Sequence, residues 1–248
     1  MPRAVAINVG ANTNLPGVRG PIYDDGRFEY VPIPEREPVD ESVPTYADLD
    51  LDTTLPPDTL DTPVHLDPTF AEYACCDRYT YGDDYGVKAR PLLDLSAGDY
   101  VFFYATLSTT DEAVESAPTA EPAPWIAPEW GAYVIGQFRL ARDPLSGEEF
   151  RALPAADRRW FDANAHVRRA EFDARVLLAG DPDESALYDR ALPLSTAAAG
   201  SDANRIVTDL SSDSGKGPWW RRPMRFDPPA VDELLAIRAD GAFERCVA

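Results

Sequence analysis

The sequence LLDLSAGDYVFFYATL, from Leu92 to Leu107, combines a turn and an apolar run in a way that predicts a buried strand. The turn is Ala97-Gly98-Asp99, since glycine and aspartate favour tight turns. From Tyr100 to Tyr104 every residue is aromatic or β-branched, and these types are enriched in strands. A half-exposed strand would alternate apolar and polar residues, and this run does not. We therefore predict a strand that is buried on both faces.

A second apolar segment, WGAYVIGQFRL from Trp130 to Leu140, has a similar character. Its large apolar residues include Tyr133, Ile135 and Phe138. Gly136 interrupts them, and a glycine inside a strand is typical of a bulge or of a close backbone approach. The two segments are therefore predicted to be neighbouring strands of a small, curled sheet.

The rest of the chain adds shorter elements to this pair. We expect strands at 3–9, 164–169 and 172–179, and helices within 145–164, at 185–190 and at 229–238. The predicted fold class is α+β, with a mixed, strongly bent sheet or a small β-barrel flanked by a few helices.

Length and composition predict a single domain over residues 1–248, because a chain of 248 residues that is 44% hydrophobic can bury one large core. Two inserts rich in Asp, Glu, Thr and Pro, 36–64 and 109–128, are predicted to be long acidic surface loops. Residues 196–218 are small and polar and are predicted to form a further loop.

The formal net charge of −20 would ordinarily argue against a nucleic-acid partner, because phosphate binding relies on Lys and Arg. Lysine is almost absent, with only Lys88 and Lys216, whereas aspartate is abundant. This composition resembles that of cytoplasmic proteins from a salt-accumulating, halophilic archaeon. In molar salt the Debye length is roughly 3 Å, so repulsion between an acidic surface and phosphate is largely screened. Charge alone therefore does not exclude a nucleic-acid or nucleotide partner.

The cysteines Cys75, Cys76 and Cys246 have neither the spacing of a metal site nor that of a disulfide framework, so we expect reduced thiols in a cytoplasmic protein. A zinc site could be drawn from His65, His166 and the adjacent cysteines, but adjacent cysteines rarely bind one ion, and we predict no metal site. The sequence identifies no cofactor. No apolar run approaches the roughly 20 residues that cross a bilayer, and the N-terminus does not resemble a signal peptide, so no membrane partner is expected.

Common catalytic patterns are missing from the sequence. There is no Gly-x-Ser-x-Gly elbow around Ser195, no Walker phosphate loop and no dinucleotide-binding glycine pattern. Near the predicted strand ends, however, aromatic residues occur together with polar ones. They are Tyr79, Tyr81, Tyr104, Trp130 and Tyr133, with Asn8, Asn12, Arg19, Asp67, Asp83, Asn164, His166 and Arg168. A nucleobase needs this mixture, since aromatic faces stack on it and polar groups contact its edges. For each residue taken singly, a core or capping role is the commoner alternative.

Several motifs, in order along the chain, resemble one known family. They are NVGANTNLPGVRGPIYDDGRFEYVPIPE (8–35), HLDPTF (65–70), TYGD (80–83), the two strand segments, NAHVRR (164–169) and LLAGDPDESALYDRALPLS (177–195). They are similar to the third type of nucleotide modification associated domain, a family of bacteria, archaea and phages proposed from genomic context to act in the modification of DNA bases. The resemblance implies a pathway more firmly than a reaction.

A looser resemblance concerns the strand pair. Gly98, Asp99, Val101, Phe103 and Tyr104, followed by Gly136 and Phe138, are similar to the pattern of PUA-like barrels, which include the EVE and ASCH domains. Asn164 and His166 match an Asn-x-His that EVE domains carry near their ligand cleft. EVE domains hold a flipped, modified base, so the resemblance implies a small barrel that binds a nucleobase. The long N-terminal extension and the large inserts depart from that pattern.

Three functions follow from these observations. The first is recognition of a modified or flipped nucleobase or nucleotide, with DNA as the first choice of partner. The second is an enzyme that itself modifies a base or nucleotide, with Asp67, Asp83 or His166 as general acid or base. The third is a non-catalytic scaffold that binds a base-modifying enzyme. The candidate base- or nucleotide-binding residues are Asn8, Gly10, Asn12, Arg19, Thr80, Tyr81, Gly82, Tyr104, Asn164, Arg168 and Ser195.

Overall fold

The predicted strand pair forms the centre of the molecule. The structure is a computed structural model, which describes residues 1–14, 16–39, 43–73, 75–110 and 122–247. β6 (Tyr100–Thr109) and β7 (Trp130–Arg139) pair antiparallel along almost their whole length. The pair is buried on both faces over most of its residues, as the aromatic run predicts. Residues 111–121 of the predicted acidic insert 109–128 lie outside the described residues.

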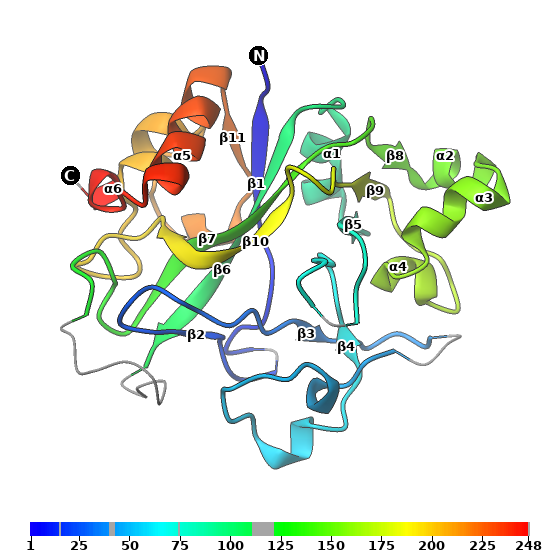
Figure 1. Ribbon diagram of the computed structural model, residues 1–248, viewed down its shortest axis with the longest axis horizontal. Coiled ribbons are helices and arrows are strands. Elements are labelled where there is room, and N and C mark those ends of the chain that lie inside the picture. The colour runs from blue at the N-terminus through cyan, green and yellow to red at the C-terminus, as the bar shows by residue number, and fades with distance from the viewer. Residues whose placement is uncertain (15, 40–42, 74, 111–121, 248) are drawn as a thin grey trace.

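Six strands form the main sheet (Figure 1). In spatial order they are β10 (Ala186–Pro193), β7, β6, β1 (Ala4–Asn8) and β11 (Met224–Phe226), with β2 (Pro21–Ile22) beside the C-terminal end of β6. β1 and β2 run parallel to β6 and the other pairs are antiparallel, so the sheet is mixed, as predicted. In the described part of the chain this sheet is open, and the PUA-like barrel is not confirmed.

Two smaller sheets and several short helices surround the main sheet. One small sheet pairs β3 (Ile33–Pro34) with β4 (Val64–His65), and the other has the order β5 (Thr80–Asp83), β9 (Val176–Ala179), β8 (Leu145–Ser146). The α-helices are α1 (Gly86–Leu93), α2 (Gly147–Ala152), α3 (Ala155–Arg158), α4 (Ala165–Arg168), α5 (Pro228–Asp240) and α6 (Glu244–Val247). Figure 1 shows α2, α3 and α4 gathered around β8 and β9, away from α5 and α6. The class is therefore α+β.

Short helical turns occupy two stretches that we predicted as loops. Residues 36–64 contain η1 (Tyr46–Asp48) and η2 (Pro57–Thr59), and they bury the side chains of Tyr46, Leu49 and Leu55. Residues 196–218 contain η4 (Ile206–Leu210), and η5 (Trp219–Arg221) follows them. These stretches contribute apolar side chains to the core, so they are packed parts of the fold.

Two of the predicted elements have the wrong type. Residues 185–190, predicted to be helical, lie largely in strand β10, because pairing with β7 outweighs local helix propensity. Residues 164–169, predicted to be a strand, contain α4, because the Asn164 side chain caps this helix by accepting from the backbone N–H of His166. The last predicted helix, 229–238, is confirmed as α5. Within the described residues, none of the helices has the length and apolar character to span a bilayer.

Gly136 allows β7 to approach its neighbours closely. The β6–β7 register shifts where Phe103 pairs with Gly136, which is the bulge that the glycine predicts. A Cβ atom at position 136 would lie 2.7 Å from the Phe70 ring and 2.8 Å from the Ala186 carbonyl oxygen. The Phe70 ring in turn packs against Phe103 and Phe138, with ring centroids 5.7 and 5.5 Å away. The aromatic core therefore depends on the missing side chain.

We expect Gly136→Ala to destabilise the fold by about 1–3 kcal/mol, because the added methyl group overpacks the core against backbone as well as ring atoms. Chemical denaturation monitored by circular dichroism measures the free energy of unfolding. Gly86→Ala is the matched control, because a Cβ there would meet only Arg175 at 3.4 Å and the residue is helical. An equal effect of both substitutions would contradict the packing argument.

Candidate functional site

Two histidines and an aspartate meet beside strands β4 and β5 and helix α4. His65 ends β4 and Asp67 follows two residues later, so both side chains leave the extended chain on the same side. His166 lies in the first turn of α4. The Nε2 atoms of His65 and His166 are 4.0 and 3.5 Å from Asp67 Oδ2. All three residues are buried, so their side chains interact strongly with one another.

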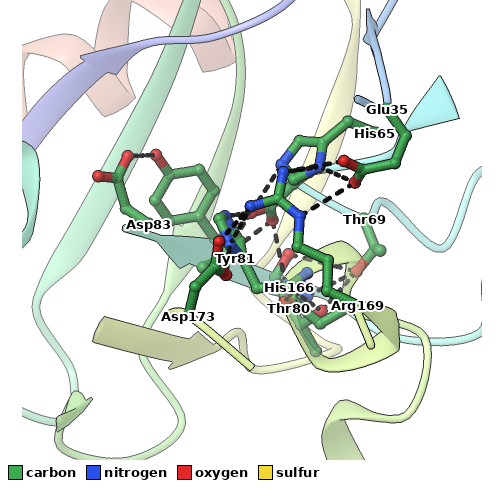
Figure 2. A network of polar contacts seen from close by, with 12 residues as sticks. Glu35, His65, Thr69, Thr80, Tyr81, Asp83, His166, Arg169 and Asp173 are labelled. Carbon is green, nitrogen blue, oxygen red and sulfur yellow. Dashed lines mark hydrogen bonds and ion pairs between the residues drawn. The ribbon is translucent and has the colours of Figure 1, made fainter. Parts of the chain in front are cut away.

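Each imidazole is oriented by a carboxylate behind it. His65 Nδ1 is 2.6 Å from Glu35 Oε2, and His166 Nδ1 is 2.7 Å from Asp173 Oδ1. Arg169 joins the two carboxylates, since its Nη2 donates to Glu35 at 3.0 Å and its Nη1 donates to Asp173 at 2.5 Å. Figure 2 shows the guanidinium group between these two histidine–carboxylate pairs. Both rings are therefore held from the side that faces away from Asp67.

The Asp67 carboxylate is fixed by a strand and by a helix cap. It accepts hydrogen bonds from the backbone N–H of Gly82, at 2.9 and 3.1 Å, and from Asn164 Nδ2 at 3.2 Å. Gly82 lies in β5, and a Cβ atom there would be 2.8 Å from the His166 ring. Glycine at this position thus lets α4 pack directly on β5 and brings His166 to Asp67.

Burial and mutual charge shift the titration of the cluster. Burial raises the pKa of Asp67 to about 8, against the opposing effects of His166 and the Gly82 N–H. Burial lowers the pKa of His65, although Glu35 partly offsets it. Burial also acts to lower the pKa of His166, but Asp173 and the charge of Asp67 outweigh it and raise that pKa. The pKa values of Asp67 and His166 are therefore both raised above their ordinary values.

The two carboxylates that contact the histidine Nδ1 atoms, Glu35 and Asp173, have lowered pKa values and stay ionised. Burial acts to raise the pKa of Glu35, but hydrogen bonds from His65, the Glu37 N–H and Arg169 lower it to about 2. Asp173 shows the same balance, and its pKa is lowered by His166 and Arg169 against the effect of burial. An ionised carboxylate only accepts hydrogen bonds, so the Nδ1 atoms of His65 and His166 carry the protons. The Nε2 atom of each ring then faces Asp67.

The cluster lies in a pocket of about 390 Å³. The lining residues are Asn8, Val9, Gly10, Asn12, Ile33, His65, Asp67, Tyr81, Gly82, Asp83, Asp84, Tyr85, Lys88, His166 and Arg169. The end of β1 forms one wall, and the segment from β5 into α1 forms another. Tyr85 is 69% exposed and is the one large apolar side chain in this lining that projects strongly into solvent. The pocket therefore has buried charged groups inside and an accessible aromatic ring at its edge.

Eight of the predicted site residues line this pocket. They are Asn8, Gly10, Asn12, Asp67, Tyr81, Gly82, Asp83 and His166. Thr80 and Asn164 lie directly behind it, since Asn164 Nδ2 contacts both Asp67 and the Thr80 hydroxyl. Tyr81 is 3% exposed and donates its hydroxyl proton to Asp83, as Figure 2 shows.

Four predicted site residues lie elsewhere. Arg19 stacks on Trp130, with its guanidinium carbon 4.7 Å from the ring centroid. Tyr104 is fully buried and donates to the Arg222 carbonyl. Ser195 accepts from the Ala132 N–H and donates to the Gly200 carbonyl. Arg168 lines a separate pocket together with Cys75 and Cys76.

Although His65 was considered as a zinc ligand together with the cysteines, several residues of the site were not among the predicted site residues. They are Glu35, His65, Tyr85, Lys88, Arg169 and Asp173. The His-x-Asp spacing of His65 and Asp67 was a usable signal, because alternate residues of an extended chain share a face. Glu35 and Arg169 are 134 positions apart, and no local pattern joins them.

The comparisons with known proteins agree with the sequence motifs. The family model for nucleotide modification associated domain 3 matches residues 3–236 of the 248. Searches of the curated proteins and of the solved structures find no match. The matched range includes the whole main sheet and every residue of the pocket. The chain therefore belongs to the nucleotide modification associated domain 3 family, whose description suggests a role in a nucleic-acid modification pathway.

Proposed function

We propose that this pocket binds a nucleobase or nucleotide and that the chain carries out one step of its modification there. The observation that carries the proposal is the meeting of His65, Asp67 and His166 inside a pocket of about 390 Å³. That volume falls in the range of small-ligand sites, roughly 300–1,000 Å³. Buried groups of this kind act on a substrate by exchanging a proton with it or by holding a cation against it.

A reaction accounts for these residues better than recognition alone. A site that only reads a base needs aromatic faces and hydrogen-bonding groups. Tyr81 and Tyr104, which we predicted to stack on the base, are buried among other core groups. Burying three ionisable side chains is costly, and recognition does not require it. Strongly shifted pKa values inside a pocket are instead typical of reacting groups.

The pocket is suited to the base more than to a nucleic-acid backbone. Asn8 and Asn12 place amide groups in its lining, and Tyr85 offers an exposed ring on which a base can stack. Among the described residues of the lining, the Lys and Arg side chains are Lys88 and Arg169, and both are paired with carboxylates. Few cations are thus left to bind phosphates. We therefore favour a single nucleotide or a base flipped out of its strand as the substrate.

Loss of the reacting groups should abolish the modification. In a host strain that lacks the gene, plasmid-borne Asp67→Asn or His166→Ala should fail to restore a modified nucleoside that the wild-type gene restores. Mass spectrometry of nucleosides from DNA, tRNA and the free nucleotide pool measures this. Val87→Ala is the control, because this side chain is 67% exposed on α1 and does not line the pocket. A nucleoside profile that is the same with and without the gene would refute the enzymatic proposal and favour a reading role.

Removing the exposed ring should weaken nucleotide binding. Stacking of a base on an aromatic side chain is worth about 1–3 kcal/mol, so Tyr85→Ala should raise the dissociation constant roughly 5- to 150-fold. Tyr85→Trp, which keeps a flat ring, should retain binding. Calorimetric titration with the common ribo- and deoxyribonucleoside monophosphates provides the measurement. If Tyr85→Ala binds them as tightly as wild type does, the base does not stack at this position.

The raised pKa of Asp67 predicts how stability depends on pH. The folded-state pKa, about 8, lies above the unfolded value of about 3.9, so this group favours the folded state at low pH. That contribution declines as pH rises from about 4 to 8, by at most about 1.4 kcal/mol per pH unit. Asp67→Asn has no such titration, so its stability relative to wild type should increase over this range. Urea denaturation at several pH values, in a buffer containing a chelator, tests this, and parallel curves for the two proteins would contradict it.

A further inference from the structure

We infer that His65, Asp67 and His166 form a binding site for a divalent transition-metal ion. Each offers one ligand atom, and these atoms all lie within 4.8 Å of one another. Two ligands of one ion, each about 2.0–2.2 Å from it, are roughly 3–3.5 Å apart. The distance of 3.5 Å between His166 Nε2 and Asp67 Oδ2 already has this value, and the 4.0 Å to His65 Nε2 is close to it.

The orientation of the two rings leaves their lone pairs directed at Asp67. Glu35 and Asp173 accept the Nδ1 protons, so Nε2 is free to act as a ligand when the imidazole is neutral. Arg169 also lies 3.2 and 3.3 Å from the two Nδ1 atoms, but the carboxylates are nearer. Three electron-rich atoms therefore converge in a buried space. Such an arrangement repels itself unless a positive species lies between the atoms, and a divalent ion supplies that charge.

The surrounding residues have the arrangement that supports metal ligands. Metal-binding histidines usually donate their second ring N–H to a carboxylate, which fixes the ring and makes it a stronger ligand. Glu35 and Asp173 do this for the two histidines, and Arg169 holds both carboxylates in place. The Asp67 carboxylate is held in turn by Gly82 and Asn164. A carboxylate behind each ring, with its own supporting contact, is the arrangement found around metal-binding histidines.

The charge of the cluster matches a divalent cation. Asp67, Glu35 and Asp173 carry three negative charges when ionised, and Arg169 carries one positive charge, which leaves −2 with neutral imidazoles. Asp83 does not change this balance, because Lys88 lies 3.6 Å from it. With all three carboxylates ionised, this buried charge would be costly without a compensating cation. One divalent ion neutralises it.

Two nitrogens and one oxygen favour a transition metal. Mg²⁺ and Ca²⁺ prefer oxygen ligands only, whereas imidazole suits Zn, Fe, Ni and Cu, and two histidines with one carboxylate leave coordination positions open. Those positions would face the pocket that Asn8, Tyr85 and Lys88 line. From the sequence we predicted no metal site, because we considered the histidines only together with Cys75 and Cys76. These cysteines line a different pocket.

Metal binding can be measured without any substrate, so the inference stands or falls separately from the proposed function. Chelator-treated protein is titrated with Zn²⁺, Co²⁺ and Mn²⁺ by calorimetry in molar KCl, which screens weak binding of cations to the acidic surface. After desalting, elemental analysis counts the retained ions. We expect one ion per chain for wild type. His65→Ala and His166→Ala should weaken binding at least 100-fold, and Asp173→Asn should weaken it roughly 10- to 100-fold at unchanged stoichiometry.

Two controls keep the result interpretable. Cys75→Ser should bind the ion as wild type does, which separates this site from the cysteine pair. Circular dichroism checks the fold of each variant, and His166→Gln replaces His166→Ala if the latter unfolds. The inference is overturned if wild type retains no ion, if folded His166 variants bind as tightly as wild type, or if Cys75→Ser alone removes the ion.

Discussion

The site depends on one interaction, the bridge that Arg169 makes between Glu35 and Asp173. Its guanidinium group satisfies two ionised carboxylates that would otherwise be costly in a largely buried environment. Backbone contacts reinforce it, since the Ala170 N–H donates to the Pro38 carbonyl. Because removing one partner of a buried ion pair leaves an uncompensated charge, this bridge constrains the positions of both histidines at once. The Pro38 contact also ties the start of the 36–64 stretch to the site.

The main sheet supports the site, whereas the small sheets and α4 carry its polar residues. The main sheet supplies rigidity, since β1 runs parallel to β6 and ends at Asn8, with Gly10 turning the chain at φ 83° toward the pocket. The small sheets and α4 supply the chemistry, because His65, Gly82 and His166 come from three short elements that could not stay folded alone. Short elements of this kind are not stable in isolation and must pack against a larger core. The aromatic core around Phe103 provides this support, and Tyr81 connects that core to the pocket with its ring centroid 5.4 Å from the Phe103 ring.

The sequence was informative where structure is decided locally and uninformative where it is decided by distant partners. The β6–β7 pair and α5 were predictable because apolar runs, turn residues and a proline at the helix start act within a few positions. Strand β10 was not predictable in this way, because its extended conformation depends on pairing with β7, which is distant in the sequence. Within the site, Asp67, Asp83 and His166 were found from motifs, whereas Glu35 and Arg169 acquire their role only through a contact across 134 positions. Tyr104 shows the opposite error, since an aromatic residue that is suited to stack on a base is equally suited to fill a core.

The acidic character of the chain has different consequences at the surface and in the pocket. Charges at the surface are screened within roughly 3 Å in molar salt, so a net charge of −20 neither attracts cations strongly nor repels a nucleotide there. The carboxylates of Glu35 and Asp67 are nearly inaccessible to water and salt, with side chains 3% and 2% exposed, so their field is screened much less. High salt would therefore weaken the binding of cations to surface carboxylates, whereas the buried cluster would still bind a cation. A metal centre set behind a base-sized pocket is thus compatible with an acidic protein, because the charge that acts on the ligand is the local buried one and not the total.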